Sequence, residues 1–279
     1  MNITSITNIE GKKKIAILDT SAVSFLQHIN EKCSSAEVIL KDYDLILIPR
    51  WVVKEISDSK ISASYVEGLM EKGYPIFSIA EEDYTSLVNY EEWNLYQIVK
   101  ASVNLLGQIK GYLRRYIEKT DPLDMDAYAE WINKLYDEWP IEGNILSSGR
   151  YKKKNAGEVS ITILAEILSW YYPESEMITI YSHDSDTRAF QTSAEDQLRK
   201  VFTSRVPIPV SYKSNDAILC HLFRLGILSE EDIRSDRKAN RRITYSKVMN
   251  DKSVAFATEL LDTNDFINLV KDNSVHIVF

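Results

Sequence analysis

The sequence predicts an α/β protein with a central, mostly parallel sheet. Short runs that are apolar at every position recur along the chain, as in strands covered on both faces of a parallel sheet. Longer segments with apolar residues at helical spacing lie between these runs, and this alternation is typical of α/β folds. Hydrophobic residues make up 44% of the 279 residues, enough for a sizeable core. We interpret the whole chain, 1–279, as one domain with additions, although its length also allows two modest domains.

The apolar runs give the expected elements in chain order. The first strand is residues 15–18, because four apolar residues follow three lysines and lead into an Asp-Thr-Ser turn. Later strands are expected at 45–48, 75–79, 177–181 and 206–210, the last confined to a sheet edge by two prolines. Helices are expected at 22–30, after Pro49, from about Gly157 and over 214–228. The helix from Gly157 is apolar nearly all round, which predicts burial.

Two segments differ from this pattern. Residues 81–142 carry 13 acidic and 6 basic residues, a net charge of −7, together with three tryptophans and seven tyrosines. Apolar residues recur there at helical spacing from Leu95 to Leu113, so we expect a helical insertion outside the central sheet. Its aromatic face is interpreted as core packing rather than base stacking, because the flanking charge is acidic. Residues 229–279 are expected to form a C-terminal extension, with a helix start at Ser229 and an edge strand at 275–279.

The charge pattern limits how this chain can bind nucleic acid. A formal net charge of −8 gives no general attraction to a polyanion, so phosphate contacts need a local basic patch. Two basic segments provide candidates, and the second has helical spacing. Their members are Lys152, Lys153 and Lys154, and then Arg234, Arg237, Lys238 and Arg241. We interpret both as substrate-binding, with ordinary solvated faces as the alternative.

Cysteine content and hydropathy indicate a reducing compartment. Cys33 and Cys220 are too few for a disulfide framework. The N-terminal segment lacks the apolar core of a signal peptide, because Gly11 and three lysines interrupt it. No apolar run approaches the roughly 18 residues of a membrane span. We therefore expect a cytoplasmic protein with no membrane partner.

Five acidic residues are expected at one end of the sheet. Asp19 follows the first strand, and Asp184 and Asp186 follow the strand at 177–181. Glu55 and Glu158 lie near the N-terminal turns of two helices that are reached from the same end. Carboxylates that lie close together repel, and a hard divalent cation such as Mg²⁺ or Mn²⁺ compensates. Such an ion activates water and stabilises the charge of a phosphodiester transition state.

Each of these acids also has a plain structural explanation. An aspartate between a strand and a helix, such as Asp19, is typical of a helix cap. The pair Asp184 and Asp186 is typical of a turn. Glu158 suits a helix N-terminus through the helix dipole, and Glu55 suits a solvated helix face. The joint position of Asp19 and the Asp184–Asp186 pair at the carboxyl ends of two strands favours a site over these explanations.

Four segments of the chain resemble, in order, the acidic motifs of PIN-domain nucleases. They are residues 17–21 with Asp19, 49–56 with Glu55, 155–158 with Glu158, and 182–188 with Asp184 and Asp186. The resemblance covers about 15–80 and 155–230. The spacing between Glu55 and Glu158 is longer than in a minimal member, and the tail after 230 is additional.

The resemblance implies a Rossmann-like α/β/α sandwich and a metal-dependent ribonuclease or structure-specific nuclease, and we expect RNA as the substrate. It implies that Asp19, Glu158 and Asp184 are the core metal ligands, that Asp186 is a fourth acid and that Glu55 supports the site. Cleavage would leave a 5′-phosphate and a 3′-hydroxyl. Some members are toxins of toxin–antitoxin pairs, so a protein inhibitor or partner subunit is an expected partner beside RNA.

Two other functions are compatible with parts of the sequence. A haloacid-dehalogenase-type phosphatase also has an Asp at a strand end, but it needs a second Asp two residues later, where this chain has Ser21. A PIN-like fold used as a nucleic-acid- or protein-binding regulatory module, with a weak or absent active site, stays open. A divalent ion bound between Asp19 and Asp184 would favour the nuclease, because a binding module does not need one.

Overall fold

The computed structural model describes residues 1–33, 35–111, 113, 127–146, 149–249 and 251–278. Within these residues, a five-stranded sheet has the order β3-β2-β1-β6-β7, and every pair in it is parallel. Its strands are β1 (Lys14–Leu18), β2 (Leu45–Pro49), β3 (Ile76–Ile79), β6 (Met177–Tyr181) and β7 (Val210–Lys213). The expected α/β class with a parallel central sheet is therefore confirmed.

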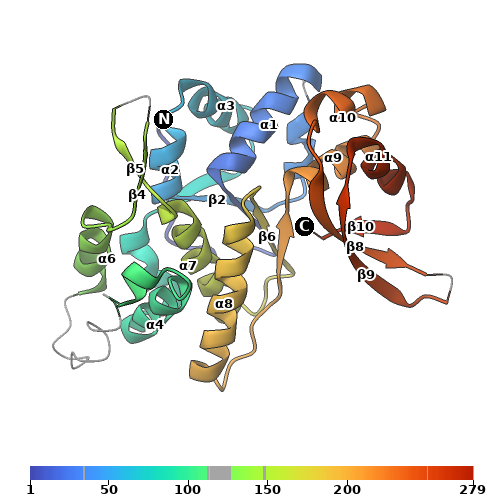
Figure 1. The fold of residues 1–279 in the computed structure, drawn as a ribbon. Coiled ribbons are helices and arrows are strands. Elements are labelled where there is room, and N and C mark those ends of the chain that lie inside the picture. The colour runs from blue at the N-terminus through green and yellow to red at the C-terminus, as the bar shows by residue number, and fades with distance from the viewer. Residues whose placement is uncertain (34, 112, 114–126, 147–148, 250, 279) are drawn as a thin grey trace.

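Helices connect the strands and cover the sheet (Figure 1). The helices between β1 and β3 are α1 (Thr20–Cys33), the 3₁₀ helix η1 (Ala36–Leu40), α2 (Arg50–Ile56) and α3 (Lys60–Glu71). The helices before, between and after β6 and β7 are α7 (Ala156–Tyr171), α8 (Ser185–Val201) and α9 (Asn215–Arg224). The strands of the central sheet can all be parallel because the chain returns through helices between one strand and the next.

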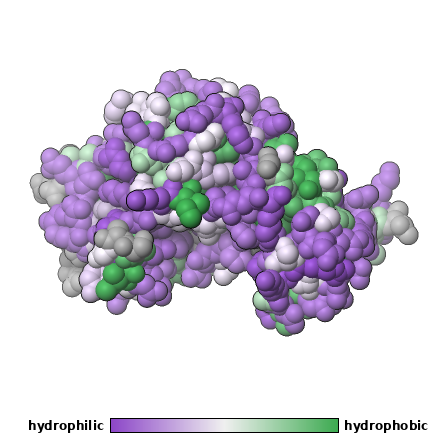
Figure 2. Space-filling model, turned by 90° about the horizontal axis from the view of Figure 1, so that it is seen from above, coloured by the Kyte–Doolittle hydropathy of each residue, from purple (hydrophilic) through white to green (hydrophobic). Residues whose placement is uncertain are grey.

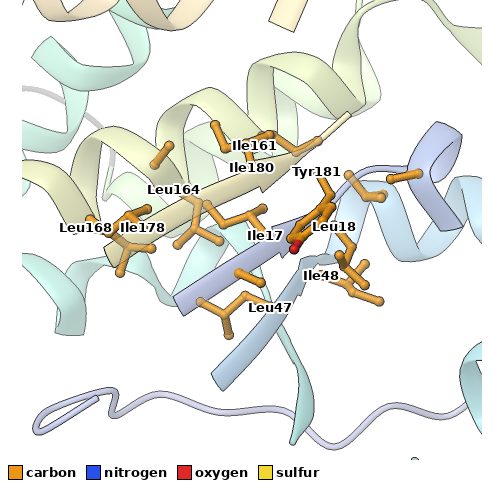
Figure 3. Packing of buried hydrophobic residues seen from close by; sticks show 14 of the residues in the cluster. Ile17, Leu18, Leu47, Ile48, Ile161, Leu164, Leu168, Ile178, Ile180 and Tyr181 are labelled. Carbon is orange, nitrogen blue, oxygen red and sulfur yellow. The ribbon is translucent and has the colours of Figure 1, made fainter. Parts of the chain in front are cut away.

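The long helix α7 forms the main contact with the sheet. In Figure 3 it runs alongside β6, with Ile161 and Leu164 against Ile178 and Ile180 of that strand. Fourteen of its sixteen residues are buried, as the apolar sequence predicted. Successive side chains of a strand point to opposite faces, and Tyr181, next to Ile180, contacts Tyr43 and the carbonyl of Ile39 instead. The segment at η1 therefore covers the face opposite α7.

The described part of residues 81–142 adds no strand to the central sheet. It forms the 3₁₀ helix η2 (Glu81–Val88), α4 (Glu92–Ser102) and α6 (Tyr128–Asp137). The helical period expected from Leu95 to Leu113 is interrupted by a turn after Ser102. Its aromatic side chains pack on one another, with Tyr96 against Tyr128 and Trp131, as the core-packing interpretation expected. A short antiparallel hairpin follows, β4 (Glu142–Ile145) and β5 (Tyr151–Lys153).

The C-terminal segment differs in part from its expectation. It comprises α10 (Glu230–Asp236), α11 (Thr263–Lys271) and an antiparallel sheet of β8 (Arg241–Val248), β9 (Val254–Leu261) and β10 (Val275–Ile277), in the order β10-β8-β9. The capping box of Ser229 and Asp232 starts α10, as the sequence indicated. The edge strand near the C-terminus forms, but in this second sheet.

Two expected elements are corrected. The last strand of the central sheet starts at Val210 rather than spanning 206–210, because Pro207 and Pro209 lack the N–H groups that a ladder needs. The helical basic stripe does not form, because α10 ends at Asp236 and Arg241 already begins β8. The division into domain, insertion and extension stays a prediction.

The surface seen from above is mostly hydrophilic, with hydrophobic residues in small separate patches (Figure 2). Its outline is notched beside the part on the right, where Figure 1 places the C-terminal elements. In the described part of the chain, none of the helices combines the length and apolar character needed to cross a membrane.

Candidate functional site

The candidate site lies where the direction of chain connection across the sheet reverses. From β1 the chain continues outward to β2 and β3, whereas β6 lies on the other side of β1 and leads outward to β7. Open α/β sheets bind ligands outside the carboxyl ends of strands at such a switch point. Asp19 directly follows β1, and Ser182, His183 and Asp184 directly follow β6. The structure therefore places Asp19 and the Asp184–Asp186 pair at the ends of two neighbouring strands, on either side of the switch point.

Asp19 is held in one orientation. Its carboxylate is 5% exposed and accepts the Thr20 N–H at 2.7 Å through Oδ1. Its Oδ2 accepts the hydroxyls of Ser21 at 2.6 Å and Ser182 at 2.8 Å. Asp19 also stands directly before α1, and its carbonyl accepts the N–H of Val23 in that helix. Three donors thus fix the orientation of the carboxylate.

The same two serines tie Asp19 to the end of β6. The His183 N–H donates to Ser21 Oγ at 3.0 Å, and the Asp184 N–H donates to Ser182 Oγ at 3.1 Å. Asp184 in turn caps α8, because its Oδ1 accepts the Asp186 N–H at 2.9 Å. The two strand ends are thus linked through the hydroxyls of Ser21 and Ser182.

Glu55 and Glu158 approach Asp19 from α2 and α7. The Thr20 hydroxyl donates to Glu55 Oε2 at 3.2 Å, which holds Glu55 beside the start of α1. Gly157 lies against the same carboxylate, and a Cβ added there would sit 3.3 Å from Glu55 Oε1. Glu158 is the next residue of α7, and its Oε2 is buried with no hydrogen-bond partner among the described residues.

The three acids influence one another electrostatically. Burial raises the pKa of Glu158 to about 7, and the charges of Asp19 and Glu55 add to the effect. Burial likewise raises the pKa of Glu55, with the nearby Lys152 ammonium opposing it and Asp19 adding to it. Perturbed carboxylates of this kind gather at functional sites more often than elsewhere. Asp19, Glu55 and Glu158 are referred to below as the acidic cluster.

Of the three lysines at 152–154, Lys152 contacts the acidic cluster. It projects from the hairpin β4–β5, and its Nζ lies 3.5 Å from Glu55 Oε2. Burial lowers its pKa, but the charges of Glu55, Glu158 and Asp19 outweigh burial and raise it. Lys153 instead donates to the carbonyls of Tyr136 and Asp137, and Lys154 is exposed.

The other two predicted ligands lie at the rim. Asp184 is partly exposed and Asp186 is exposed, and both sit in the first residues around the start of α8. Across the described ranges, no three His, Cys, Asp or Glu side chains are gathered closely enough to hold a metal ion by themselves. The expected convergence of Asp19, Glu158 and Asp184 on one ion thus stays a prediction.

The basic residues of the tail are dispersed rather than aligned. Arg234 pairs with Glu230 along α10 and with Asn264. Arg237 is fully buried, with Nε 3.2 Å from Asp216 Oδ1, so it offers no surface to a substrate. Lys238 is exposed and stays available. Arg241 is partly exposed and lies 3.3 Å from the same Asp216 oxygen. The expectation of a shared phosphate-binding stripe is corrected on this point.

Sequence reasoning missed three residues near the crevice. Asp216 follows the end of β7 and was treated only as part of the helix expected over 214–228, although an acid after a parallel strand was already the signal used for Asp19. Gly157 was noted within a motif but not as the residue that leaves room for Glu55. Arg242, next to Arg241, had no distinguishing signal in the sequence.

Comparisons with models of protein families, with curated proteins and with solved structures found no match to this chain.

Proposed function

We propose that the protein is a metal-dependent phosphodiester hydrolase, most closely described as a PIN-like endoribonuclease. The observation that carries the proposal is the acidic cluster at the switch point of the sheet, in which Glu158 Oε2 is buried and has no partner among the described residues. Three repelling carboxylates in a partly buried crevice are costly for folding alone, and a divalent cation offsets that cost. The order of the acidic motifs resembles that of PIN nucleases, many of which are ribonucleases, and this resemblance supports RNA as the proposed substrate.

The donor set fits a hard cation. Asp19 and Glu158 supply carboxylate oxygens, and Mg²⁺ is commonly held by one or two carboxylates while waters and substrate phosphates complete its shell. A third protein ligand in direct contact is therefore not required, and Asp184 at the rim suits a bond through water. When bound, such an ion lowers the pKa of water and neutralises charge on the phosphate.

The chain itself supplies orientation. Ser21 and Ser182 fix Asp19 Oδ2, and their bonds to the backbone at His183 and Asp184 set the distance between the two strand ends. Glu55, held by Thr20, lies close enough to Glu158 for its charge to help raise the pKa of Glu158. This arrangement places fixed acids on both sides of the crevice before any ligand arrives, as pre-organised electrostatic catalysis requires.

A second candidate function is a binding module with a silent site. It is favoured by Lys152, whose ammonium already pairs with Glu55 and compensates the acidic cluster without a metal. A protein of this kind would bind nucleic acid through its basic residues and leave the phosphodiester intact. The two functions differ in whether Mn²⁺ binds at Asp19.

The test compares the wild type with Asp19→Asn, with and without Mn²⁺. In the wild type, Mn²⁺ should raise the melting temperature, since binding to the folded state adds about 2.7 kcal/mol at a hundredfold excess over Kd. Asp19→Asn keeps the shape, deletes one charge, and should lose both RNA cleavage and most of this shift. It should leave the metal-free protein at least as stable, because one repelling charge is gone.

The matched control is Asp265→Asn, which makes the same change at an exposed position in the first turn of α11. It should behave like the wild type in both assays. Equal cleavage by wild type and Asp19→Asn would remove the nuclease assignment. Equal Mn²⁺ shifts would move the metal site elsewhere, and a DNA substrate run in parallel decides between RNA and DNA.

A further inference from the structure

A pocket lies beside the acidic cluster, on the side of the C-terminal sheet. Its volume is about 470 Å³, within the range of roughly 300–1,000 Å³ that small-ligand sites occupy. Its wall combines three separate parts of the chain, namely His183 and Ser185 after β6, Ser214 and Asp216 after β7, and Arg241 and Arg242 of β8. His183 and Ser185 flank Asp184, so the pocket adjoins the rim of the candidate active site.

The charges in this pocket do not cancel. Among the described residues that line the pocket, Asp216 carries the one carboxylate. Arg237 is buried and does not line the pocket, and its Nε lies 3.2 Å from that carboxylate. Arg241 shares the same oxygen at 3.3 Å. Arg242 is exposed, and its side chain forms no hydrogen bond or ion pair with another described residue. Two arginines at the wall and one behind it thus face Asp216, while Asp184 lies at the rim beside His183.

Two helix starts add to this positive potential. Ser185 is the first residue of α8, and Ser214 is the N-cap of α9, whose first turn carries Asp216. Both helices are long enough to have a substantial dipole, with 17 and 10 residues. Helix N-termini and arginine forks are the groups that bind phosphate oxygens in proteins.

We infer that this pocket is a phosphate subsite, which holds a phosphate of a nucleic-acid strand while a neighbouring part of that strand lies at the acidic cluster. This inference rests on the proposed function for its ligand. The acidic cluster repels a polyanion, and Arg242 supplies a cation that no described acid neutralises, so the pocket fixes the strand that the cluster alone would not retain. The strand then passes over Asp184 between the two sites.

The experiment measures binding of labelled single-stranded RNA by fluorescence anisotropy in the Asp19→Asn background, where cleavage is not expected. Arg242→Gln should weaken binding about tenfold and lower the slope of log K against log salt by about 0.7, the value for one phosphate of a single strand. Arg242→Lys keeps the charge and should restore the slope, although without the bidentate fork it should not restore all of the affinity.

Lys252→Gln is the matched control, because it removes one positive charge from an exposed position between β8 and β9 that does not line the pocket. It should leave affinity and slope nearly unchanged. Equal losses for Arg242→Gln and Lys252→Gln, or no loss for either, would overturn the subsite. The assay is repeated with RNA that carries a 5′-phosphate and with RNA that carries a 5′-hydroxyl. If the pocket holds a terminal phosphate, Arg242→Gln weakens binding of the 5′-phosphorylated RNA only. If the pocket holds an internal phosphate, the substitution weakens binding of both RNAs.

The subsite and the nuclease fail separately. Binding that depends on Arg242, without any cleavage by the wild type, would retain the pocket and support the binding module. Cleavage by the wild type with binding that is indifferent to Arg242 would retain the nuclease and remove the pocket.

Discussion

Single residues set the geometry of the acidic cluster, and Gly157 is the clearest case. It is buried in the first turn of α7, next to Glu158, and it leaves room for the Glu55 carboxylate. A Cβ at this position would lie 3.3 Å from Oε1 and 3.5 Å from Oε2 of Glu55. The neighbour that must move is the end of a side chain, so the site changes while the helix does not.

Gly157→Ala should therefore separate stability from function. Alanine is favoured over glycine within a helix by up to about 1 kcal/mol, which offsets the displaced carboxylate. We expect unchanged or slightly raised stability, together with slower RNA cleavage and a smaller Mn²⁺-induced melting shift. Gly68→Ala in α3 is the control, since a Cβ there meets nothing within 4 Å. If both variants cleave RNA at the wild-type rate, the position of Glu55 does not matter for the site.

Lys152 tests whether the acidic cluster is built for a cation. Lys152→Met removes the ammonium that pairs with Glu55 and is attracted to Glu158 and Asp19. The metal-free protein should become less stable because the carboxylates repel without compensation. The Mn²⁺-induced melting shift should become larger, because the ion no longer competes with the ammonium. Lys154→Met, exposed at the end of the same hairpin, should change neither. A smaller Mn²⁺ shift in Lys152→Met would show that the lysine does not compete with the metal.

Among the secondary-structure elements, Glu81 joins the two helices that carry Glu55 and Glu158. It is fully buried at the start of η2, and its Oε1 accepts the Trp51 N–H of α2 at 3.0 Å and the Ser160 hydroxyl of α7. Its Oε2 has no partner among the described residues. The first residue of the acidic insertion is thus a fixed point for the site, which its sequence context did not indicate.

Glu81 also predicts a pH dependence of stability. Burial raises its pKa from 4.5 to about 7, so the folded state holds this proton up to about pH 7 whereas the unfolded state releases it near 4.5. Stability from this group is therefore present below pH 4.5 and is lost as the pH rises to about 7. The shift corresponds to about 3 kcal/mol at about 1.36 kcal/mol per unit.

Glu81→Gln should remove this dependence. Its amide oxygen can still accept both hydrogen bonds, and it has no charge to bury. In urea unfolding the variant should be more stable than the wild type at pH 8, by up to about 3 kcal/mol, and similar to it at pH 4.5. Glu82→Gln serves as the control, since that carboxylate is only partly buried and pairs with Arg50. A variant that is no more stable at pH 8 would contradict the burial of a charge at Glu81.

The sequence predicted most elements where the signal was local. Apolar runs marked the central strands, and the all-apolar pattern of α7 correctly indicated its burial. The helical basic stripe expected over 234–241 does not form. Its spacing in the sequence does not show that Arg237 pairs with Asp216, which lies 21 residues earlier in the chain. Their buried pair turns Arg237 inward and ends α10. The grouping of Asp19 with Glu158 depends on the sheet order, which no single segment encodes.

At the scale of the whole molecule, charge is unevenly distributed around the site. Residues 81–142 hold 13 of the acidic residues against 6 basic ones, and their helices lie on the opposite side of Figure 1 from β8 with its two arginines. A polyanion is therefore expected to approach from the C-terminal side, over Arg242, and to avoid the insertion. Function and fold both depend on how the C-terminal elements are held to the sheet.

Arg237 makes that connection. Its guanidinium is fully buried and bonds Asp216 of α9 through Nε and the Leu261 carbonyl at the end of β9 through Nη2, at 3.0 Å. It also lies over the ring of Phe266 in α11, 4.6 Å from the ring centre. Its own carbonyl accepts the hydroxyl of Thr263. One side chain thus contacts α9, the second sheet and α11.

Arg237→Met should lower the free energy of unfolding by about 3–5 kcal/mol, because it leaves Asp216 buried without its main partner. Arg234→Met, on the surface of α10, removes the same kind of charge and should cost no more than about 1 kcal/mol. Adding Asp216→Asn to Arg237→Met should recover part of the loss, since the uncompensated charge is then absent. Urea unfolding of the four proteins measures these differences. A loss in Arg237→Met no larger than in Arg234→Met would show that the C-terminal elements are held by their apolar contacts alone, and that the buried pair sets only the end of α10.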